Sequence, residues 1–293
     1  MYLSTGHRTS LFRFEGDDVR IVCPVAEREY HGYIDIYTPY GISGFVGTGP
    51  CKDFPHYWRN WAKDNGYISG YIVLNPMLAN ESHFLAVETY MQGTIYVLDL
   101  WLGSDRLFKN LHENRKRQLR TWEQRAVKFI TDKQILTSYM LEHYPAFVRS
   151  VDAADAYHLS QDTIRFLCGL DSISLVGMCG PEGIEAVSMF SFTPYIGDYL
   201  FNVPLPRGRH HGVDLIWWGV QSLKGLQVPM LNLGGGARRE DGIARFKQFF
   251  GARKIPFSCL KEVYQPDQYK ELCRQACVNP DDKIGYFPPY LKG

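Results

Sequence analysis

The sequence lacks every short motif that marks the most common enzyme classes. Its 293 residues contain no Gly-x-Ser-x-Gly elbow, no Walker phosphate loop, no dinucleotide-binding fingerprint and no His-Glu-x-x-His pair. Each of these motifs places a nucleophile, a phosphate cradle or a metal at a defined point of a fold. Their absence argues against serine hydrolases, P-loop NTPases, common dehydrogenases and zinc proteases.

Clustered cysteines are missing as well. The seven cysteines are scattered along the chain, and none belongs to a Cys-x-x-Cys pair. Cys273 and Cys277 are four residues apart, but neither a histidine nor a second cysteine pair completes a zinc ligand set. We therefore predict reduced thiols and no metal site.

The chain has neither a strong charge of one sign nor a long apolar run. Lys and Arg number 32 against 31 Asp and Glu, a formal net charge of +1, which disfavours non-specific electrostatic binding of nucleic acid. The apolar stretch 67–78 is shorter than the ~20 residues that a membrane-spanning helix needs. Because the segment 1–16 shows no secretion pattern, the sequence predicts a soluble, cytoplasmic protein.

The residues that are present are typical of a mixed α/β globular protein. Hydrophobic residues make up 45% of the chain and aromatic residues 14%, enough for the cores of two units. Hydrophobic periodicity predicts the following elements. Strands are expected at 18–25, 33–37, 67–74, 94–100, 127–130, 173–179, 185–192, 199–203, 230–233 and 256–263, and helices at 54–65, 107–125, 134–148, 160–168, 213–224 and 243–250.

The two halves of the sequence resemble one another. Three short matches recur at similar separations: Thr38-Pro39-Tyr40 with Thr193-Pro194-Tyr195, Trp58 with Trp217, and Pro76-Met77-Leu78 with Pro229-Met230-Leu231. Each half runs strand, turn, loop, Trp-bearing helix, strand. The pattern predicts duplicated α/β units at 1–132 and 133–275, followed by a C-terminal tail at 276–293.

A phosphate-binding turn is one interpretation of the segment 204–212, which lies between a predicted strand and a predicted helix. Glycine permits a tight turn, and the N-terminus of the helix then offers unpaired N–H groups to an anion. Arg207 and Arg209 would add charged donors that suit phosphate. The alternative is a solvated connection in which these residues have no special role.

Several motifs together resemble a known family. They are Leu231-Asn232-Leu233-Gly234-Gly235-Gly236, Asp241-Gly242-Ile243, Phe246-Lys247-x-x-Phe250-Gly251, Asp35, Thr38-Pro39-Tyr40-Gly41 and Asn114-Arg115-x-Arg117. This ordered set, spread over about 33–269, resembles the FemAB-like and BioF2-like acyltransferases of the GNAT superfamily, including the FemX-type tandem GNAT proteins. Arg209-x-x-Gly212 also resembles the GNAT pyrophosphate turn, but Asp214 stands where that turn has Gly or Ala.

The resemblance implies two tandem GNAT-like units and direct transfer of an activated acyl or aminoacyl group onto an amine. It implies a catalytic role for Lys247, which would stabilise the oxyanion, and contact of Phe246 with the donor. Asp198 and Glu185 are candidate bases near the expected cleft of the second unit. The other expected site residues are Arg207, Arg209, Gly212, Gly234 and Gly235 for the donor, and Tyr37, Tyr40, Arg115, Arg117 and Trp217 for the acceptor.

Several of these residues have a purely structural alternative. Lys247 could be a surface lysine of an amphipathic helix, and the arginines at 115 and 117 a solvated helix face. No tightly bound cofactor is expected. Acyl-CoA is the favoured co-substrate and aminoacyl-tRNA the second candidate, and the expected partner is a small or nucleotide-linked amine. A non-catalytic GNAT-like binding module is the third hypothesis.

Overall fold

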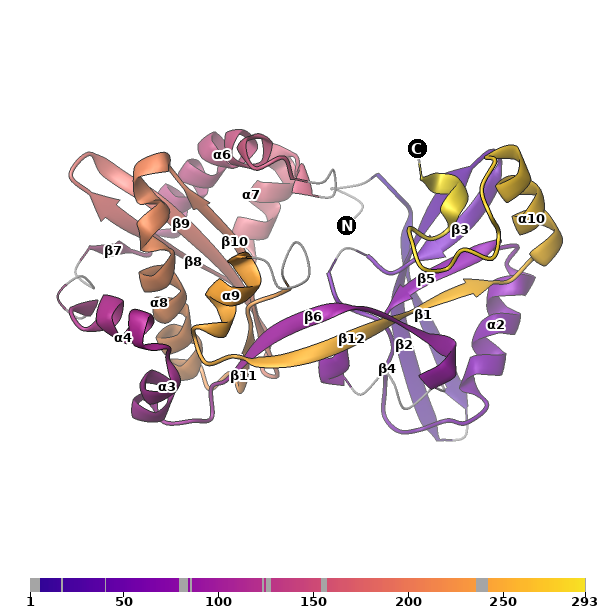
Figure 1. Ribbon diagram of the computed structural model, residues 1–293, viewed down its shortest axis with the longest axis horizontal. Helices are drawn as coiled ribbons and strands as arrows, with labels where there is room; N and C mark the ends of the chain where they lie inside the picture. The colour runs from indigo at the N-terminus through magenta and orange to yellow at the C-terminus, as the bar shows by residue number, and fades with distance from the viewer. Residues whose placement is uncertain are drawn as a thin grey trace. The chain divides into compact units, whose positions relative to one another are not determined.

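The computed structural model describes residues 6–292, except 17, 40, 79–83, 85, 123, 125–127, 154–156 and 236–241. The chain forms two compact units, labelled by element in Figure 1. Unit 1 comprises Met1–Gly93 and Pro256–Gly293, and unit 2 comprises Thr94–Ile255. No helix among the described residues is both long and apolar enough to cross a membrane.

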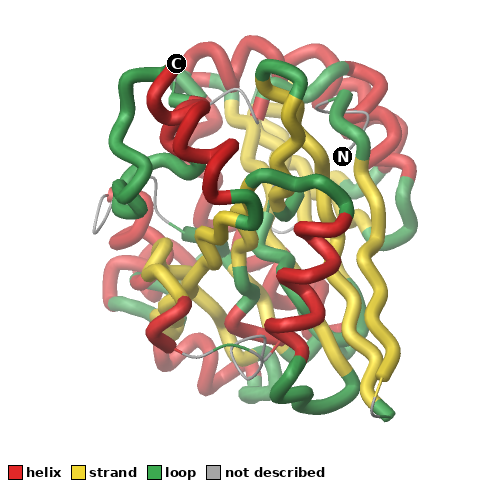
Figure 2. Tube along the Cα trace, turned by 90° about the vertical axis from the view of Figure 1, so that its right-hand side faces the viewer, coloured by secondary structure: helices red, strands yellow, loops and turns green. Residues whose placement is uncertain are grey.

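Unit 1 is a mixed sheet covered by one main helix, with its strands drawn in yellow in Figure 2. Its elements are β1 (Thr9–Gly16), β2 (Val19–Tyr30), β3 (Tyr33–Tyr37), β4 (Val46–Gly47), α2 (Phe54–Asp64) and β5 (Ser69–Val73). β1, β2 and β3 pair antiparallel in sequence order, and β5 then pairs parallel to β3. α2 buries Phe54, Trp58 and Ala62, which are spaced four residues apart and so form one apolar face.

Unit 2 repeats this order of strands with more helices around it. Its elements are α3 (Ser104–Asn110), α4 (Glu113–Leu119), β7 (Phe129–Ile130), α6 (Lys133–Ser150), α7 (Gln161–Gly169), β8 (Ile173–Gly180), β9 (Gly183–Phe192), β10 (Gly197–Pro204), η5 (Pro206–His211), α8 (Gly212–Gly225), β11 (Met230–Asn232) and α9 (Gly242–Gln248). β8, β9 and β10 pair antiparallel, and β11 pairs parallel to β10 after α8. Both units therefore contain the same strand–strand–strand–helix–strand arrangement.

In each unit, the last parallel strand pairs on its other side with a strand from a distant part of the chain. β6 (Thr89–Asp99) follows β5 in sequence but pairs antiparallel with β11 in unit 2. β12 (Arg253–Val263) follows α9 but pairs antiparallel with β5 in unit 1. Because of this exchange, the compact units differ from the predicted ranges 1–132 and 133–275.

The sequence matches between the halves are only partly structural equivalences. Trp58 on α2 and Trp217 on α8 are both buried on the helix that links the parallel strands. Thr38 follows β3, before the helix, whereas Thr193 precedes β10. Pro76–Leu78 forms a short 3-10 helix, whereas Pro229 leads directly into β11.

Two predicted elements differ from the structure, and two elements of the structure were not predicted. The helix predicted at 107–125 is divided into α3 and α4, because Leu111 and His112 are extended and the His112 imidazole accepts the Asn114 N–H. The loop predicted at 204–212 contains η5, which runs directly into α8. β1 and the helix α10 (Pro266–Gln275) were not predicted.

The segment predicted as a tail packs into unit 1. Phe287 and Tyr290 are 4% and 3% exposed, and the Tyr290 hydroxyl donates to Asp35 Oδ1 at 2.7 Å. The Ser69 hydroxyl donates to the same oxygen at 2.6 Å. Burial raises the pKa of Asp35, and the two donors partly offset that rise. Asp35 therefore ties the C-terminal segment to β3 and β5.

Candidate active site

The candidate site lies in unit 2, where the parallel strands β10 and β11 separate. The strands pair at only two positions, Gly197 with Leu231 and Asp198 with Asn232. β11 ends at Asn232, while β10 continues to Pro204 after an irregularity between Tyr199 and Phe201. Such bulges re-aim strands and are over-represented beside active sites. Beyond Asn232 the chain continues into the glycine-rich segment, which includes Gly234 and Gly235.

An asparagine joins this glycine-rich segment to a buried acid. The Asn232 Nδ2 donates to Asp198 Oδ1 at 2.9 Å, and the Asn232 Oδ1 accepts the Gly234 N–H at 2.8 Å. Burial raises the pKa of Asp198, and the hydrogen bond from Asn232 lowers it in part. A carboxylate with a raised pKa is better suited to accept a proton near neutral pH.

Lys247 reaches the same segment from α9. Its side chain is almost buried, with the residue 8% exposed, and Nζ donates to the Gly235 carbonyl oxygen at 2.5 Å. Gly234 has φ +75°, and a Cβ added there would lie 3.3 Å from Lys247 Nζ. Glycine is therefore needed at 234 for both backbone conformation and space. The structure thus brings together Lys247, Gly234, Gly235 and Asp198, four of the residues predicted for catalysis or donor binding.

Phe246 and Arg115 form a second part of the site. The Arg115 guanidinium lies 4.5 Å from the centroid of the Phe246 ring, a cation–π distance. A Cβ added to Gly212 would lie 3.7 Å from the same ring. Arg115 is 8% exposed, and burial lowers its pKa, since desolvation disfavours the charged form. Arg117, two residues further along α4, is exposed and does not share this environment.

The segment predicted as a phosphate-binding turn is helical. η5 continues into α8 at Gly212, and His211, the last residue of η5, has a helical conformation. Arg207 is already paired with Glu182 and, through Nε, with Glu185 at 3.4 Å. Arg209 is exposed. The predicted loop at 204–212 is therefore wrong, since residues 206–211 are helical and run directly into α8.

Asp214, the residue that departs from the GNAT pattern, lies in the first turn of α8. It is 6% exposed, and the N-cap position belongs to His211, whose side chain makes no capping hydrogen bond. A buried acid in the first turn does complement the helix dipole.

Three residues near η5 could hold a metal ion. Glu185, His210 and His211 each offer one ligand atom, and these atoms lie within 4.8 Å of one another. The sequence analysis missed this group, because Glu185 is brought to the adjacent histidines only by β9. Its carboxylate already receives His211 Nε2 at 3.0 Å and the Arg207 guanidinium. The Glu185 carboxylate therefore already takes part in a network with His211 and Arg207, whereas the buried His211 Nδ1 has no hydrogen-bond partner among the described residues.

Of the remaining predicted acceptor residues, the structure describes Trp217 and Tyr37. Trp217 is 7% exposed and packs in the core of unit 2, 6.0 Å from the Phe108 ring centroid. Tyr37 belongs to unit 1, where its hydroxyl lies 2.6 Å from His7 Nδ1. Tyr40 lies outside the described residues.

In unit 1 the parallel strands β3 and β5 also pair at two positions, Ile36 with Gly70 and Tyr37 with Tyr71. Beyond β3, the Thr38 N–H donates to the Tyr71 carbonyl at 3.0 Å and the Thr38 hydroxyl accepts the Val73 N–H at 2.9 Å. Phe54, at the start of α2, is 0% exposed within a cluster of aromatic side chains. In unit 1, Thr38 thus continues the hydrogen bonding between β3 and β5 beyond their last pair.

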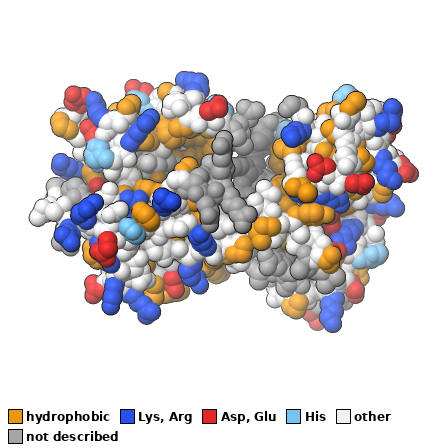
Figure 3. Space-filling view, viewed as in Figure 1, with side chains coloured by type: hydrophobic (Ala, Val, Ile, Leu, Met, Phe, Trp, Pro, Cys, Tyr) orange, Lys and Arg blue, Asp and Glu red, His pale blue; other side chains and the backbone are white. Residues whose placement is uncertain are grey.

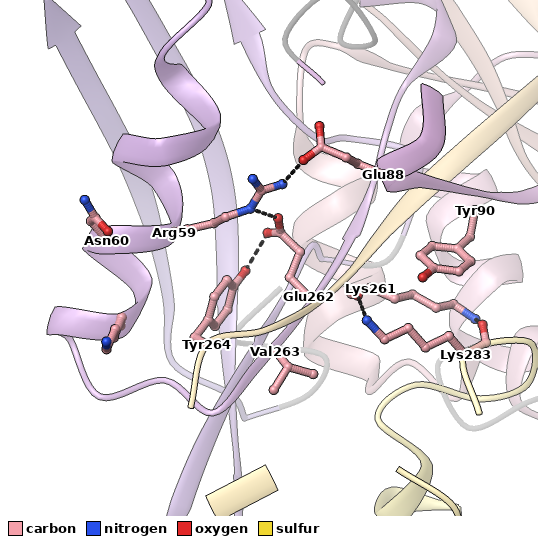
Figure 4. A pocket seen from close by; sticks show the side chains of 10 residues that line it. Arg59, Asn60, Glu88, Tyr90, Lys261, Glu262, Val263, Tyr264 and Lys283 are labelled. Atoms are coloured by element: carbon pink, nitrogen blue, oxygen red, sulfur yellow. Dashed lines mark hydrogen bonds and ion pairs between the residues drawn. The ribbon is translucent and has the colours of Figure 1, made fainter. Parts of the chain in front are cut away.

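Unit 1 does contain a polar cavity of about 330 Å³, shown in Figure 4. Its walls are formed by α2, the end of β12 and the segment around Glu88, with Arg59 bound to both Glu262 and Glu88. Lys261 donates to the carbonyls of Lys283 and Gly285 at 2.8 Å each. These charged groups are bonded to protein atoms, and none of them belongs to the Lys247 cluster.

Comparisons with known proteins identify the fold. No protein-family model and no curated protein sequence matches the chain. FemX has a TM-score of 0.65 at 11% identity, over 91% of this chain and 90% of FemX. The C-terminal domain of an Agrobacterium fabrum protein named as a lysylphosphatidylglycerol synthetase has a TM-score of 0.54 at 11% identity, covering 90% and 88%. L-PGS from Bacillus licheniformis has a TM-score of 0.53 at 10% identity, also covering 90% and 88%. The predicted mixed α/β fold of FemX type is confirmed.

Proposed function

We propose that this chain transfers an activated acyl or aminoacyl group onto an amine, and that unit 2 carries the reaction. The amine attacks the carbonyl carbon of a thioester or ester, a C–N bond forms, and the C–S or C–O bond breaks. Lys247 stabilises the oxyanion that forms on the carbonyl oxygen, and Asp198 accepts the proton that the amine loses. The leaving thiol or hydroxyl takes up a proton from solvent.

The position of Lys247 is the observation that carries this proposal. Its ammonium lies near the end of β11, 2.5 Å from a carbonyl of the glycine-rich segment, and is nearly buried, as lysines seldom are. An already oriented cation in a water-poor site acts mainly on charge that develops in the transition state. The likeness to FemX supports the proposal through the fold alone.

The donor is either an acyl-CoA or an aminoacyl-tRNA. Arg209 and Gly212 are the residues that favoured acyl-CoA, but they lie on a continuous helix instead of an open turn. This observation favours the aminoacyl ester, whose carrier does not need a pyrophosphate cradle at that point. In Figure 3, Lys and Arg are interspersed with Asp and Glu over the visible face. Contact of tRNA with this face would therefore involve basic side chains that lie among acidic ones.

Parallel binding and turnover measurements test the proposal. The melting temperature is measured with acetyl-CoA, with free CoA and with aminoacyl-tRNA, since a ligand that binds only the folded state raises it. Loss of the acyl group from the bound donor is then followed with hydroxylamine as a generic amine acceptor. The expected result is stabilisation by one donor and transfer that Lys247→Met abolishes. Stabilisation without transfer would identify a binding module, and no stabilisation by either donor would overturn the proposal.

A further inference from the structure

We infer that Asn232 is a positioning residue that couples Asp198 to the glycine-rich segment holding Lys247. This inference rests on the proposed function for its catalytic meaning, but the coupling itself can be measured without substrate. The connection is continuous in unit 2: Asp198 to Asn232, Asn232 to Gly234, and Gly235 to Lys247, with distances of 2.9, 2.8 and 2.5 Å.

The side chain of Asn232 is suited to both ends of this connection. Its carbonyl oxygen must face the Gly234 N–H, which can only donate, and its NH₂ must face the Asp198 carboxylate, which can only accept when ionised. The partners therefore determine the orientation of the amide. An aspartate at 232 could still accept from Gly234 but could not donate while ionised, and a leucine could do neither.

Each hydrogen bond of Asn232 has a separate consequence. The bond to Asp198 favours the ionised carboxylate and so opposes the rise in pKa that burial causes. The bond from Gly234 holds that residue at φ +75°, which directs the following carbonyl of Gly235 toward Lys247. Asn232 thus influences both the acid that takes the proton and the cation that faces the oxyanion.

Unit 1 contains a comparable turn, in which the Asn75 side chain bonds to backbone atoms. Asn75, two residues after β5, accepts the Met77 N–H at 2.9 Å and donates to the Ile42 carbonyl at 2.9 Å. The Asn75 Nδ2 therefore donates to a backbone carbonyl, whereas the Asn232 Nδ2 donates to the Asp198 carboxylate. The turn exists in both units, and in the described chain only the copy in unit 2 is linked to the Asp198–Lys247 pair.

The test compares Asn232→Leu, Asn232→Asp and the matched control Asn75→Leu. The pKa of Lys247 is measured by competitive labelling with an amine-reactive anhydride across pH, followed by peptide mass spectrometry. Loss of the Gly235 contact disfavours the ammonium, so Asn232→Leu should label roughly three- to tenfold faster at fixed pH, the change that half to one pKa unit produces. Asn232→Asp keeps the turn, and Lys247 should label as in the wild type.

The pH profile of transfer supplies the second measurement. Both Asn232 variants should move the acidic limb of the pH profile to higher pH, because Asp198 loses its hydrogen-bond donor. Asn232→Asp should move that limb further, because two carboxylates then adjoin. Asn75→Leu should change neither labelling nor profile. Labelling of Asn232→Leu at the wild-type rate, or an equal change in Asn75→Leu, would overturn the inference. If neither donor reacts, the proposed function fails while the labelling still decides the coupling.

Discussion

Gly208→Ala tests the placement of η5 against β9, on which the geometry around Glu185 and His211 depends. A Cβ added at Gly208 would lie 2.1 Å from the backbone oxygen of Glu185 and 2.6 Å from its carbonyl carbon. Relieving this overlap needs a shift of roughly 1 Å in one of two backbones, since non-bonded carbon contacts are favourable only beyond about 3.5 Å. The Glu185 oxygen also accepts the Leu205 N–H at 2.8 Å, and that bond would be lost or weakened.

The expected cost of Gly208→Ala follows from these two contacts. Overpacking costs about 1–3 kcal/mol and a lost hydrogen bond about 0.5–1.5 kcal/mol, together about 2–4 kcal/mol. The melting temperature should therefore fall by on the order of 5–15 °C. Gly225→Ala is the matched control, because Gly225 ends α8 with no atom within 4 Å of an added Cβ. That variant should be neutral or slightly more stable. A melting temperature for Gly208→Ala equal to that of the control would refute the reasoning.

Three further predictions concern the charged groups of unit 2. Lys247→Met should lower kcat by roughly 10²–10³ with little change in donor Kd or melting temperature, and near-normal turnover would exclude it as the oxyanion donor. Between its ordinary pKa and its raised value in the folded state, Asp198 is protonated when folded and ionised when unfolded, so it makes stability fall as pH rises through that window. Asp198→Asn should remove this fall, and an unchanged pH dependence of unfolding would contradict the prediction. Arg115→Met should raise the KM of an anionic acceptor because its buried Nε has no hydrogen-bond partner among the described residues, whereas Arg117→Met should leave that KM unchanged.

Local patterns predicted most of the individual elements. β3 is found at the predicted residues 33–37, and α8 extends the predicted helix 213–224 by one residue at each end. The split between α3 and α4 was missed because Leu111-His112 contains neither glycine nor proline, and the histidine cap that begins α4 is not a strong sequence signal. β1 was missed because only Phe12 of its eight residues is buried.

The exchange of β6 and β12 could not be predicted from sequence. Strand pairing between segments far apart in the chain leaves no local pattern, because each strand satisfies its own periodicity with either partner. The predicted boundary at 132/133 assumed that each unit is one continuous segment. The reciprocal pairing of β6 with β11 and of β12 with β5 makes unit 1 discontinuous.

The sequence likewise predicted only part of the candidate site. Lys247, Gly234 and Gly235 were identified by a motif and do lie together. Asn232 was in the same motif, but an asparagine before glycines commonly indicates a turn and not a link to an acid elsewhere in the fold. Arg115 and Arg117 could not be separated by composition, and only the packing of α4 buries the first and exposes the second.

The comparison of the two units gives a physical reason for placing the chemistry in only one of them. Both contain a helix between parallel strands, and the Thr38 hydroxyl binds the Val73 N–H in unit 1, joining those strands beyond β3. In unit 2 the pairing stops at Asp198 and Asn232, and their side chains are instead bonded to each other. Polar groups that are used to close the sheet are not free to act on a substrate. Under the proposed function, this difference at the strand ends is the reason for assigning catalysis to Asp198 and the glycine-rich segment of unit 2.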